Sequence, residues 1–199
     1  MLSACMIVLD EEECIVRALD SIHPYVDEVV IVDGGSKDRT KEIVSTYSKV
    51  SLLENPWPDD FSVQRNLAIE HAKGDWIFSL DADEYIMPYT GIMLRGLTVY
   101  NECDAYKFSY KHFLDGNFLN QFDPEYHVKM FRNYCRYIGE KHEAVRYYKY
   151  EPVIVNMEIW HEKTMTWQMK DNQRYWNMGQ TPDPGWVKES GVWVFNQRS

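Results

Sequence analysis

Short apolar runs alternate with segments of helical spacing through the first 80 residues. The runs predict strands at residues 2–9, 28–32, 50–53 and 76–80. Between them apolar residues recur every three or four positions, as in Ile15, Leu19 and Ile22, which predicts helices at 11–22, 37–47 and 61–72. Strands separated by helices pair in parallel through right-handed crossovers. The fold class expected is α/β, with a Rossmann-like, mostly parallel sheet flanked by helices.

The pattern changes after Tyr85. Strand-like segments at 104–113, 126–132 and 152–160 follow one another with few helices between them, which predicts antiparallel additions to the sheet. A closing helix is expected at 165–176, and Pro182, Pro184 and Gly185 then interrupt the chain. Because no internal repeat or linker separates the halves, residues 1–199 are expected to form one domain.

Composition narrows the class of protein. The 199 residues are 45% apolar and 26% charged, as in a globular domain with one core. Lys and Arg number 21 against 31 Asp and Glu, which gives a net charge of -10. This balance argues against unassisted binding to nucleic acid or to an anionic bilayer.

The apolar segments also bear on cellular location. The longest unbroken run, Ala4–Leu9, has six residues, far short of the roughly 20 that span a bilayer. No Lys or Arg precedes this run, so neither a transmembrane helix nor a leader is expected and we predict a cytoplasmic protein. The four cysteines show no C-x-x-C spacing and are expected to be reduced: Cys5, Cys14, Cys103 and Cys135.

Acidic residues follow three of the predicted strands, at 10–13, at Asp33 and at Asp81-Ala82-Asp83. The carboxyl ends of parallel strands share one edge of a sheet, where ligands bind. An anionic diphosphate would be repelled there, so a bridging cation is expected, and oxygen ligands suit Mg²⁺ or Mn²⁺. A D-x-D triplet by itself is weak evidence, because acidic turns are common and Asp83 also fits a loop cap.

The context of the triplet is more specific. The turn 33–40 reads D-G-G-S-K-D-R-T, residues 64–68 read Q-R-N-L-A, and residues 73–76, K-G-D-W, lead into the triplet. Over residues 3–86 this run resembles the inverting family 2 glycosyltransferases of GT-A fold. The resemblance implies a nucleotide-sugar-binding half at about 1–86 and an acceptor-binding half at about 87–199.

The same resemblance implies an activity. It is transfer of a hexosyl or N-acetylhexosaminyl group, with inversion, from a nucleotide sugar to a hydroxyl of a glycan or lipid-linked acceptor. A UDP-sugar is the favoured donor, and Mn²⁺ or Mg²⁺ the implied cofactor.

Residues of the donor half take roles from the resemblance. Asp33 would accept hydrogen bonds from uracil or ribose, although it could also cap the following helix. Gly35, with the glycine before it, permits a tight turn beside the ligand. Leu9 would offer main-chain groups to the base, and Glu11 matches an acidic family position, although the Asn usual before it is Asp10 here.

The resemblance also assigns residues to the phosphates and to the metal of the donor site. Arg65 would meet the base or a phosphate, unless it is only a surface helix residue. Asp83 would ligate the metal, while Asp81 would face the ribose or a metal-bound water, with Ala82 between them in the donor site. His161, near the end of a predicted strand, would be a third ligand, although a structural role fits it equally well.

The general base is sought in the second half. Residues 139–144, G-E-K-H-E-A, resemble a G-x-x-H-E segment of some family members, which makes Glu143 the candidate. Inverting transfer needs a carboxylate that takes the proton of the attacking hydroxyl. The E-D pair of many relatives is absent, so Asp123, Glu125 and Glu140 remain reserves.

Aromatic residues in the second half have two readings. Those between 104 and 126 suit stacking against sugars but are more typical of a strand core: Tyr106, Phe108, Tyr110, Phe113, Phe118, Phe122 and Tyr126. The late tryptophans could touch a lipid-linked acceptor, although packing is favoured: Trp160, Trp167, Trp176, Trp186 and Trp193.

Three rival functions stay open. A nucleotidyltransferase usually has a basic, Gly-rich loop after its first strand, whereas residues 10–13 are D-E-E-E. A glycoside hydrolase uses two carboxylates and needs no nucleotide subsite, which leaves the Asp33 turn unexplained. A binding module of the same fold without turnover is the third.

Overall fold

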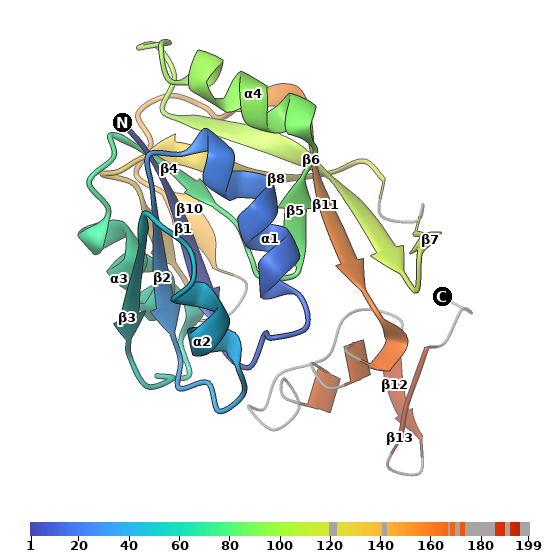
Figure 1. Ribbon diagram of the computed structural model, residues 1–199. Helices are drawn as coiled ribbons and strands as arrows, with labels where there is room; N and C mark the ends of the chain where they lie inside the picture. Colours follow the sequence, from blue (N-terminus) through green and yellow to red (C-terminus); the bar gives the residue numbers. More distant parts are fainter. Residues whose placement is uncertain are drawn as a thin grey trace.

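Parallel strands joined by helices form the first part of the computed structural model (Figure 1). The structure describes residues 1–119, 123–140, 143–166, 168–169, 172–173, 186–189 and 192–195. Four parallel strands stand in the order β3-β2-β1-β4: β1 (Leu2–Val8), β2 (Glu28–Asp33), β3 (Val50–Glu54) and β4 (Trp76–Ser79). The connections carry α1 (Ile15–Ile22), the short 3-10 helix η1 (His23–Tyr25), α2 (Thr40–Val44) and α3 (Phe61–His71). The predicted α/β sheet is confirmed.

Two of the predicted helices start later than expected. Helix α1 begins at Ile15 rather than at residue 11, because the amides of Cys14 and Ile15 both turn back to the carbonyl of Glu11, at 3.1 and 3.0 Å. Helix α2 has only five residues, since the segment before Thr40 is held by side-chain hydrogen bonds described below. In both places the residues expected to begin the helix form a turn at the carboxyl edge of the sheet instead.

Antiparallel pairs extend the sheet in the second half, as predicted. The sheet continues from β4 in the order β8-β6-β11-β5, with β8 antiparallel to both of its neighbours and β11 parallel to β6. These strands are β5 (Glu84–Ile86), β6 (Ala105–Leu114), β8 (Glu125–Arg132) and β11 (Val153–Lys163), with β7 (Asn117–Phe118) paired to β6. Two small hairpins pair β9 (Arg136–Ile138) with β10 (Ala144–Arg146) and β12 (Trp186–Glu189) with β13 (Val192–Phe195).

Helix α4 (Pro88–Leu97) was missed in the sequence. Pro88 opens it, and Leu94 and Leu97 are buried at helical spacing. Gly91 lies against the ring of Tyr25, where an added Cβ would come within 2.2 Å, so only glycine permits this approach.

The predicted closing helix at 165–176 is described only in part. Residues 165–166, 168–169 and 172–173 are helical. Its remainder, with Trp167 and Trp176 and the break at Pro182, Pro184 and Gly185, lies outside the described residues.

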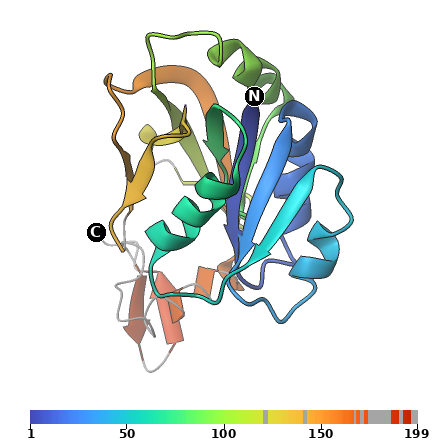
Figure 2. The same ribbon diagram turned by 90° about the vertical axis from the view of Figure 1, so that its left-hand side faces the viewer.

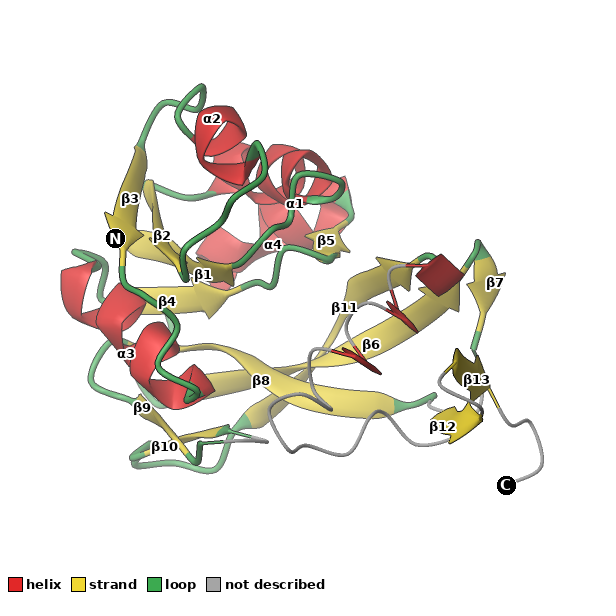
Figure 3. Ribbon diagram, turned by 90° about the horizontal axis from the view of Figure 1, so that it is seen from below, coloured by secondary structure: helices red, strands yellow, loops and turns green. Residues whose placement is uncertain are grey.

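The sheet is buried on both faces. Helices α1, α2 and α4 lie on one side and α3 on the other (Figures 2 and 3). Along β1, Ala4 and Met6 belong to the hydrophobic cluster on the side of α1 and α4, and Cys5 belongs to the cluster on the side of α3. This explains the continuous apolar run of β1. All four cysteines are buried and free, in agreement with the prediction of unpaired thiols.

Aromatic side chains of the second half divide between core and surface. Tyr106, Phe108 and Tyr110 are buried, which supports the packing reading for them. Phe113 stacks on Trp160 with centroids 4.9 Å apart. Phe118 and Tyr126 are exposed, whereas Phe122 lies outside the described residues. None of the helices in the described part of the chain has the length and apolar character to cross a bilayer.

Candidate functional site

Asp33 ends β2 with a fully buried carboxylate. Its Oδ1 accepts hydrogen bonds from the amides of Gly35 and Ser36, both at 2.8 Å. Its Oδ2 is buried with no hydrogen-bond donor among the described residues. Gly35 takes a φ of +109°, which favours glycine. One oxygen therefore shapes the turn rather than capping the following helix, because α2 begins only at Thr40.

The loop after β1 is fastened to the turn after β2. The amide of Asp10 donates to Ser36 Oγ at 2.9 Å, and the amide of Glu11 donates to Thr40 Oγ1 at 2.8 Å. We call these hydrogen bonds the loop clamp. The hydroxyls of the 33–40 motif thus hold a neighbouring loop in place.

Two of the acidic residues expected at the ligand edge are turned away from it. Asp10 Oδ1 accepts from the amide of Lys37 at 2.7 Å, and Glu12 Oε2 from the amide of Arg39 at 3.0 Å. The prediction that the acidic run converges on the ligand is therefore wrong for these two, because they satisfy backbone amides. Glu11 alone of this run lines the pocket described next.

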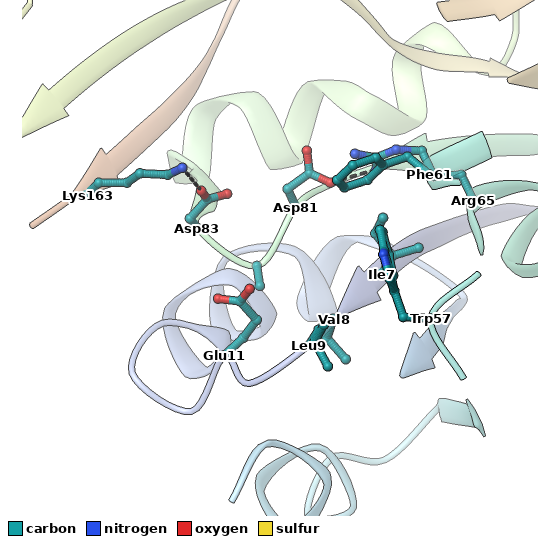
Figure 4. Close-up of a pocket in the computed structure, with 11 residues that line it drawn as sticks. Ile7, Val8, Leu9, Glu11, Trp57, Phe61, Arg65, Asp81, Asp83 and Lys163 are labelled. Atoms are coloured by element: carbon teal, nitrogen blue, oxygen red, sulfur yellow. Dashed lines mark hydrogen bonds and ion pairs between the residues drawn. The ribbon is translucent and has the colours of Figure 1, made fainter. Parts of the chain in front are cut away.

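A first pocket of about 130 Å³ opens at the carboxyl edge of β1 and β4 (Figure 4). Six of the predicted donor-site residues line it: Leu9, Glu11, Arg65, Asp81, Ala82 and Asp83. Asp33 and Gly35 are not in its lining. Figure 4 shows Asp83 toward one end of the pocket and Arg65 toward the other.

Two aromatic residues of this pocket escaped the sequence analysis. Trp57 and Phe61 pack edge to face with ring centroids 4.7 Å apart. The indole nitrogen of Trp57 is buried without a hydrogen-bond acceptor among the described residues. Asp60 caps α3 by accepting from the amides of Ser62 and Val63, which fixes Phe61 at the first helical position. The sequence signal that could have identified Phe61 is an aromatic residue directly after the helix-capping Asp60.

Asp81 is held by two cations. Its oxygens lie 2.6 Å from Arg65 Nη1 and 3.4 Å from Lys129 Nζ. Burial works to raise the pKa of Asp81, but the two cations outweigh it and hold the pKa below its ordinary value. Lys129, another residue the sequence analysis missed, is itself buried and reaches Glu84 at 2.7 Å.

Asp83 is held in the same way. Its Oδ2 lies 3.0 Å from His161 Nε2 and 3.2 Å from Lys163 Nζ. Burial opposes ionisation, yet His161 and Lys163 keep the pKa of Asp83 well below its ordinary value. Cations of the chain therefore already offset part of the negative charge of these carboxylates, and the bridging metal cation expected from the sequence stays a prediction.

A chain of hydrogen bonds leads from Asp83 across three strands. His161 Nδ1 on β11 lies 2.8 Å from His112 Nδ1 on β6. His112 Nε2 lies 3.0 Å from Glu125 Oε2, and His127 Nε2 lies 2.5 Å from the other oxygen of Glu125 on β8. His161 is thus oriented from behind, as metal-binding histidines usually are.

The residues present fit a divalent metal in part. Within the described residues, no group of three or more His, Cys, Asp and Glu side chains is arranged to hold a metal. Asp83 and His161 nevertheless lie side by side, with Oδ2 and Nε2 3.0 Å apart, and supply one oxygen and one nitrogen, a donor set that suits Mn²⁺. The other positions would fall to diphosphate oxygens and water. Asp81 is the weaker candidate because Arg65 and Lys129 engage both of its oxygens.

A second pocket of about 530 Å³ shares Arg65, Asp81, Asp83 and Lys163 with the first. Asp81 and Asp83 therefore border both pockets, and we call residues 81–83 the acidic wall.

Glu143 lines the second pocket, and its Oε1 accepts from Arg65 Nε at 2.6 Å. The reserve candidates for the base are placed elsewhere. Asp123 pairs with Lys111 at 2.8 Å, and Glu125 holds the two histidines. Glu140 is exposed. None of these three is in the lining of the second pocket.

Comparisons with known proteins were made with this geometry in view. A TPR repeat-containing protein of Synechococcus elongatus is 51% identical over 85 residues, which are 43% of this chain and 21% of that protein. The glycosyltransferase SunS of Bacillus subtilis is 34% identical over 79 residues, which are 39% of this chain and 19% of SunS. The chain thus spans about a fifth of the length of these relatives.

Solved structures share the fold. The crystal structure of Staphylococcus aureus TarS with UDP-GlcNAc is 17% identical, with a TM-score of 0.58, and covers 81% of this chain and 58% of the TarS chain. This likeness supports the GT-A architecture expected from the sequence. The sequence model of glycosyl transferase family 2 matches residues 3–150, which is most of the chain. The chain therefore belongs to glycosyl transferase family 2.

Proposed function

We propose that the chain carries the catalytic centre of a metal-dependent, inverting glycosyltransferase. It would move a hexosyl or N-acetylhexosaminyl group from a nucleotide sugar, with a UDP-sugar favoured, to a hydroxyl of a glycan or lipid-linked acceptor. The observation that carries this proposal is the acidic wall, since Asp81 and Asp83 face two pockets at once. A donor in one pocket and an acceptor in the other would meet at these carboxylates.

The first pocket suits the nucleotide. Asp33 lies outside the lining of this pocket, and we propose that its buried Oδ2 accepts a hydrogen bond from a part of the nucleoside that extends beyond the pocket, an N–H of the base or a ribose hydroxyl. A buried acceptor left without a partner is costly, so a ligand that satisfies it gains affinity. Trp57 and Phe61 add aromatic surface for a base, and the backbone of Leu9 borders the same space.

The diphosphate would lie toward Asp83. Asp83 and His161 would hold Mn²⁺ or Mg²⁺, which when bound neutralises the charge that develops on the departing nucleoside diphosphate. Lys163 contacts the same oxygen of Asp83, so a metal bound to that oxygen would replace this ion pair. Asp81 would orient the ribose or a bound water while Arg65 keeps it ionised.

Glu143 is the proposed base. Glu143 lines the second pocket, so an acceptor hydroxyl bound there would have this carboxylate within the same cavity. Proton transfer to this carboxylate would let the hydroxyl attack the sugar as the diphosphate leaves from the other face. The Arg65 contact holds the Glu143 side chain toward the wall.

A donor screen tests the proposal. UDP-, GDP- and dTDP-sugars are incubated with the protein and Mn²⁺ or Mg²⁺, and released nucleoside diphosphate is measured. We expect release from a UDP-sugar that stops in excess chelator. Full activity in chelator would contradict the metal, and measurable UDP affinity without any turnover would favour the binding-module alternative.

A further inference from the structure

The second pocket is cationic in an acidic protein. Among the described residues, its lining contains five Lys or Arg side chains and four Asp or Glu: Arg65, Lys107, Lys129, Arg146 and Lys163 against Asp81, Asp83, Glu84 and Glu143. The formal balance is therefore 5 − 4 = +1, whereas the whole chain carries -10.

All four carboxylates of this lining are already paired. The pairs are Arg65 with Asp81 and Glu143, Lys129 with Asp81 and Glu84, and Lys163 with Asp83. Three of the five cations thus serve to hold the acidic wall and its surroundings. The remaining positive charge of the pocket sits on the other two.

Those two cations are Lys107 and Arg146, and neither has a carboxylate partner among the described residues. Lys107 is half-buried on β6, opposite Val128 of β8. Arg146 ends β10, and its Nη1 donates to the carbonyl of Val145, at 3.1 Å. They reach one pocket from two separate sheets, since the β9–β10 hairpin lies beside β8 on the side of α3 (Figure 3).

We propose that the second pocket takes an anionic acceptor, one that carries a phosphate or carboxylate group. Lys107 and Arg146 would bind the anionic group, while a hydroxyl of the same molecule reaches the acidic wall. This inference rests on the proposed function for the second pocket's role as acceptor site. It goes further in naming the acceptor's charge and the residues that select it.

The donor diphosphate is a poor alternative occupant for these two cations. Lys107 and Arg146 line the second pocket but not the first, whereas Asp83 lines both. A diphosphate bound from the first pocket meets Asp83 and Lys163 at the wall. The guanidinium of Arg146 offers a planar pair of donors that matches two oxygens of one anion, and the Lys107 ammonium adds a point charge. A neutral glycan would leave both cations unused.

Binding of small probes tests the proposal in the full chain. UDP and Mg²⁺ are added at saturation to fill the first pocket, and calorimetry then measures the dissociation constants of glycerol 3-phosphate, glycerate and glycerol. We expect the two anions to bind and glycerol not to bind, with affinity falling as salt is raised. Binding of the phosphate alone would narrow the anionic group to phosphate. Equal binding of glycerol and the anions would overturn the proposal.

Variants identify the residues. Lys107→Ala and Arg146→Ala should each weaken anion binding about tenfold or more, the usual loss for a charged hydrogen bond. Lys107→Arg and Arg146→Lys should retain most of it, which separates charge from folding. Lys111→Ala is the matched control on the same strand, because Lys111 pairs with Asp123 and is not in the pocket lining. Unchanged affinity in both alanine variants, or an equal loss in the control, would overturn the proposal.

Failure of the proposed function is read separately. UDP binding and release of UDP from a UDP-sugar are measured in the same preparations. If the wild type neither binds UDP nor releases it from a UDP-sugar, the donor assignment is wrong. Anion titrations without UDP then still decide whether Lys107 and Arg146 bind an anion. If UDP is released but no anion binds, the proposed function stands and the anionic acceptor is wrong.

Discussion

The two pockets meet at the acidic wall but are built by different kinds of contact. Around the first, backbone amides bond to side chains of a nearby segment, as in the loop clamp, whose partners are 26 and 29 residues apart. Around the second, ion pairs join side chains far apart in sequence, such as Arg65 with Glu143, 78 residues on. The first frame depends on hydrogen bonds between backbone amides and side chains, and the second on ion pairs between charged side chains that a ligand can engage.

The largest expected effect breaks the wall itself. Asp83→Ala should remove transfer and Mn²⁺ binding together, because Asp83 is the proposed ligand that faces both pockets. Released diphosphate and Mn²⁺ electron paramagnetic resonance are the measurements. Glu70→Ala, an exposed change on α3, is the control. Turnover close to that of the wild type would show that the metal assignment is wrong.

Glu143→Gln separates the two pockets. It should lower transfer by at least about a hundredfold, the usual loss for a general base. The dissociation constant for UDP should stay within about twofold, since Glu143 is not in the lining of the first pocket and the amide oxygen of the new glutamine can still accept from Arg65. Kinetics and calorimetry on one preparation measure both. Normal transfer would place the base elsewhere, and Glu140→Gln is the matched control.

His112→Phe sharpens the role of the second half in metal binding. Loss of the hydrogen bond behind His161 should weaken Mn²⁺ affinity by about ten- to a hundredfold. His127→Phe is the control, because His127 bonds to the same Glu125 without a recorded contact to His161. Mn²⁺ titration followed by electron paramagnetic resonance distinguishes the two variants. Equal affinities would refute an orienting role for His112.

Thr40→Val tests the loop clamp. Removal of the hydroxyl that accepts from the amide of Glu11 should cost about 1 kcal/mol in the free energy of unfolding. Affinity for UDP should fall a few-fold, since the loop after β1 borders the first pocket. Ser45→Ala is the control, because its hydroxyl donates only to a carbonyl within the same helical turn. Urea unfolding and calorimetry report the two effects.

The smallest effect is a pH dependence. The folded-state pKa of Asp83 is depressed, so its ion pairs stabilise the fold above the ordinary carboxyl pKa of about 3.9 and are lost as pH falls through the folded pKa. Lys163→Met raises that folded pKa. The stability difference between wild type and variant should therefore be full at pH 7 and shrink by roughly a few tenths of a kcal/mol by pH 3.5.

Urea unfolding at pH 7, 5 and 3.5 measures this change. Lys41→Met provides the comparison, because Lys41 pairs with Glu54 at the surface. A wild-type advantage that grows on acidification would contradict the sign derived for Asp83.

Sequence patterns predicted the first frame better than the second. The parallel strands and the positions of Asp33, Asp81 and Asp83 at strand ends followed from apolar periodicity and from the edge where parallel strands end, whereas the order of strands in the sheet was not predicted. Helix α4 was missed because mainly strands were expected after Tyr85. Pro88 and the helical spacing of the buried residues after it are the sequence features that indicate this helix. Apolar periodicity therefore sufficed to predict individual strands and helices, which depend on local sequence.

Contacts across many residues left no such signal. Lys129 sits within a strand and reads as an ordinary alternating polar position, and only the fold brings it to Glu84 and Asp81. The same holds for Lys163 beside Asp83. Counting carboxylates without these cations led to the expectation that a metal was indispensable. The roles assigned to Glu143 and His161 remain predictions.

Arg65 spans the boundary between the two frames. One guanidinium bonds Asp81 through Nη1 and Glu143 through Nε. A ligand in either pocket that alters one of these bonds changes the state of the other. Donor and acceptor affinities are then thermodynamically linked, and by reciprocity each ligand must shift the affinity of the other by the same factor.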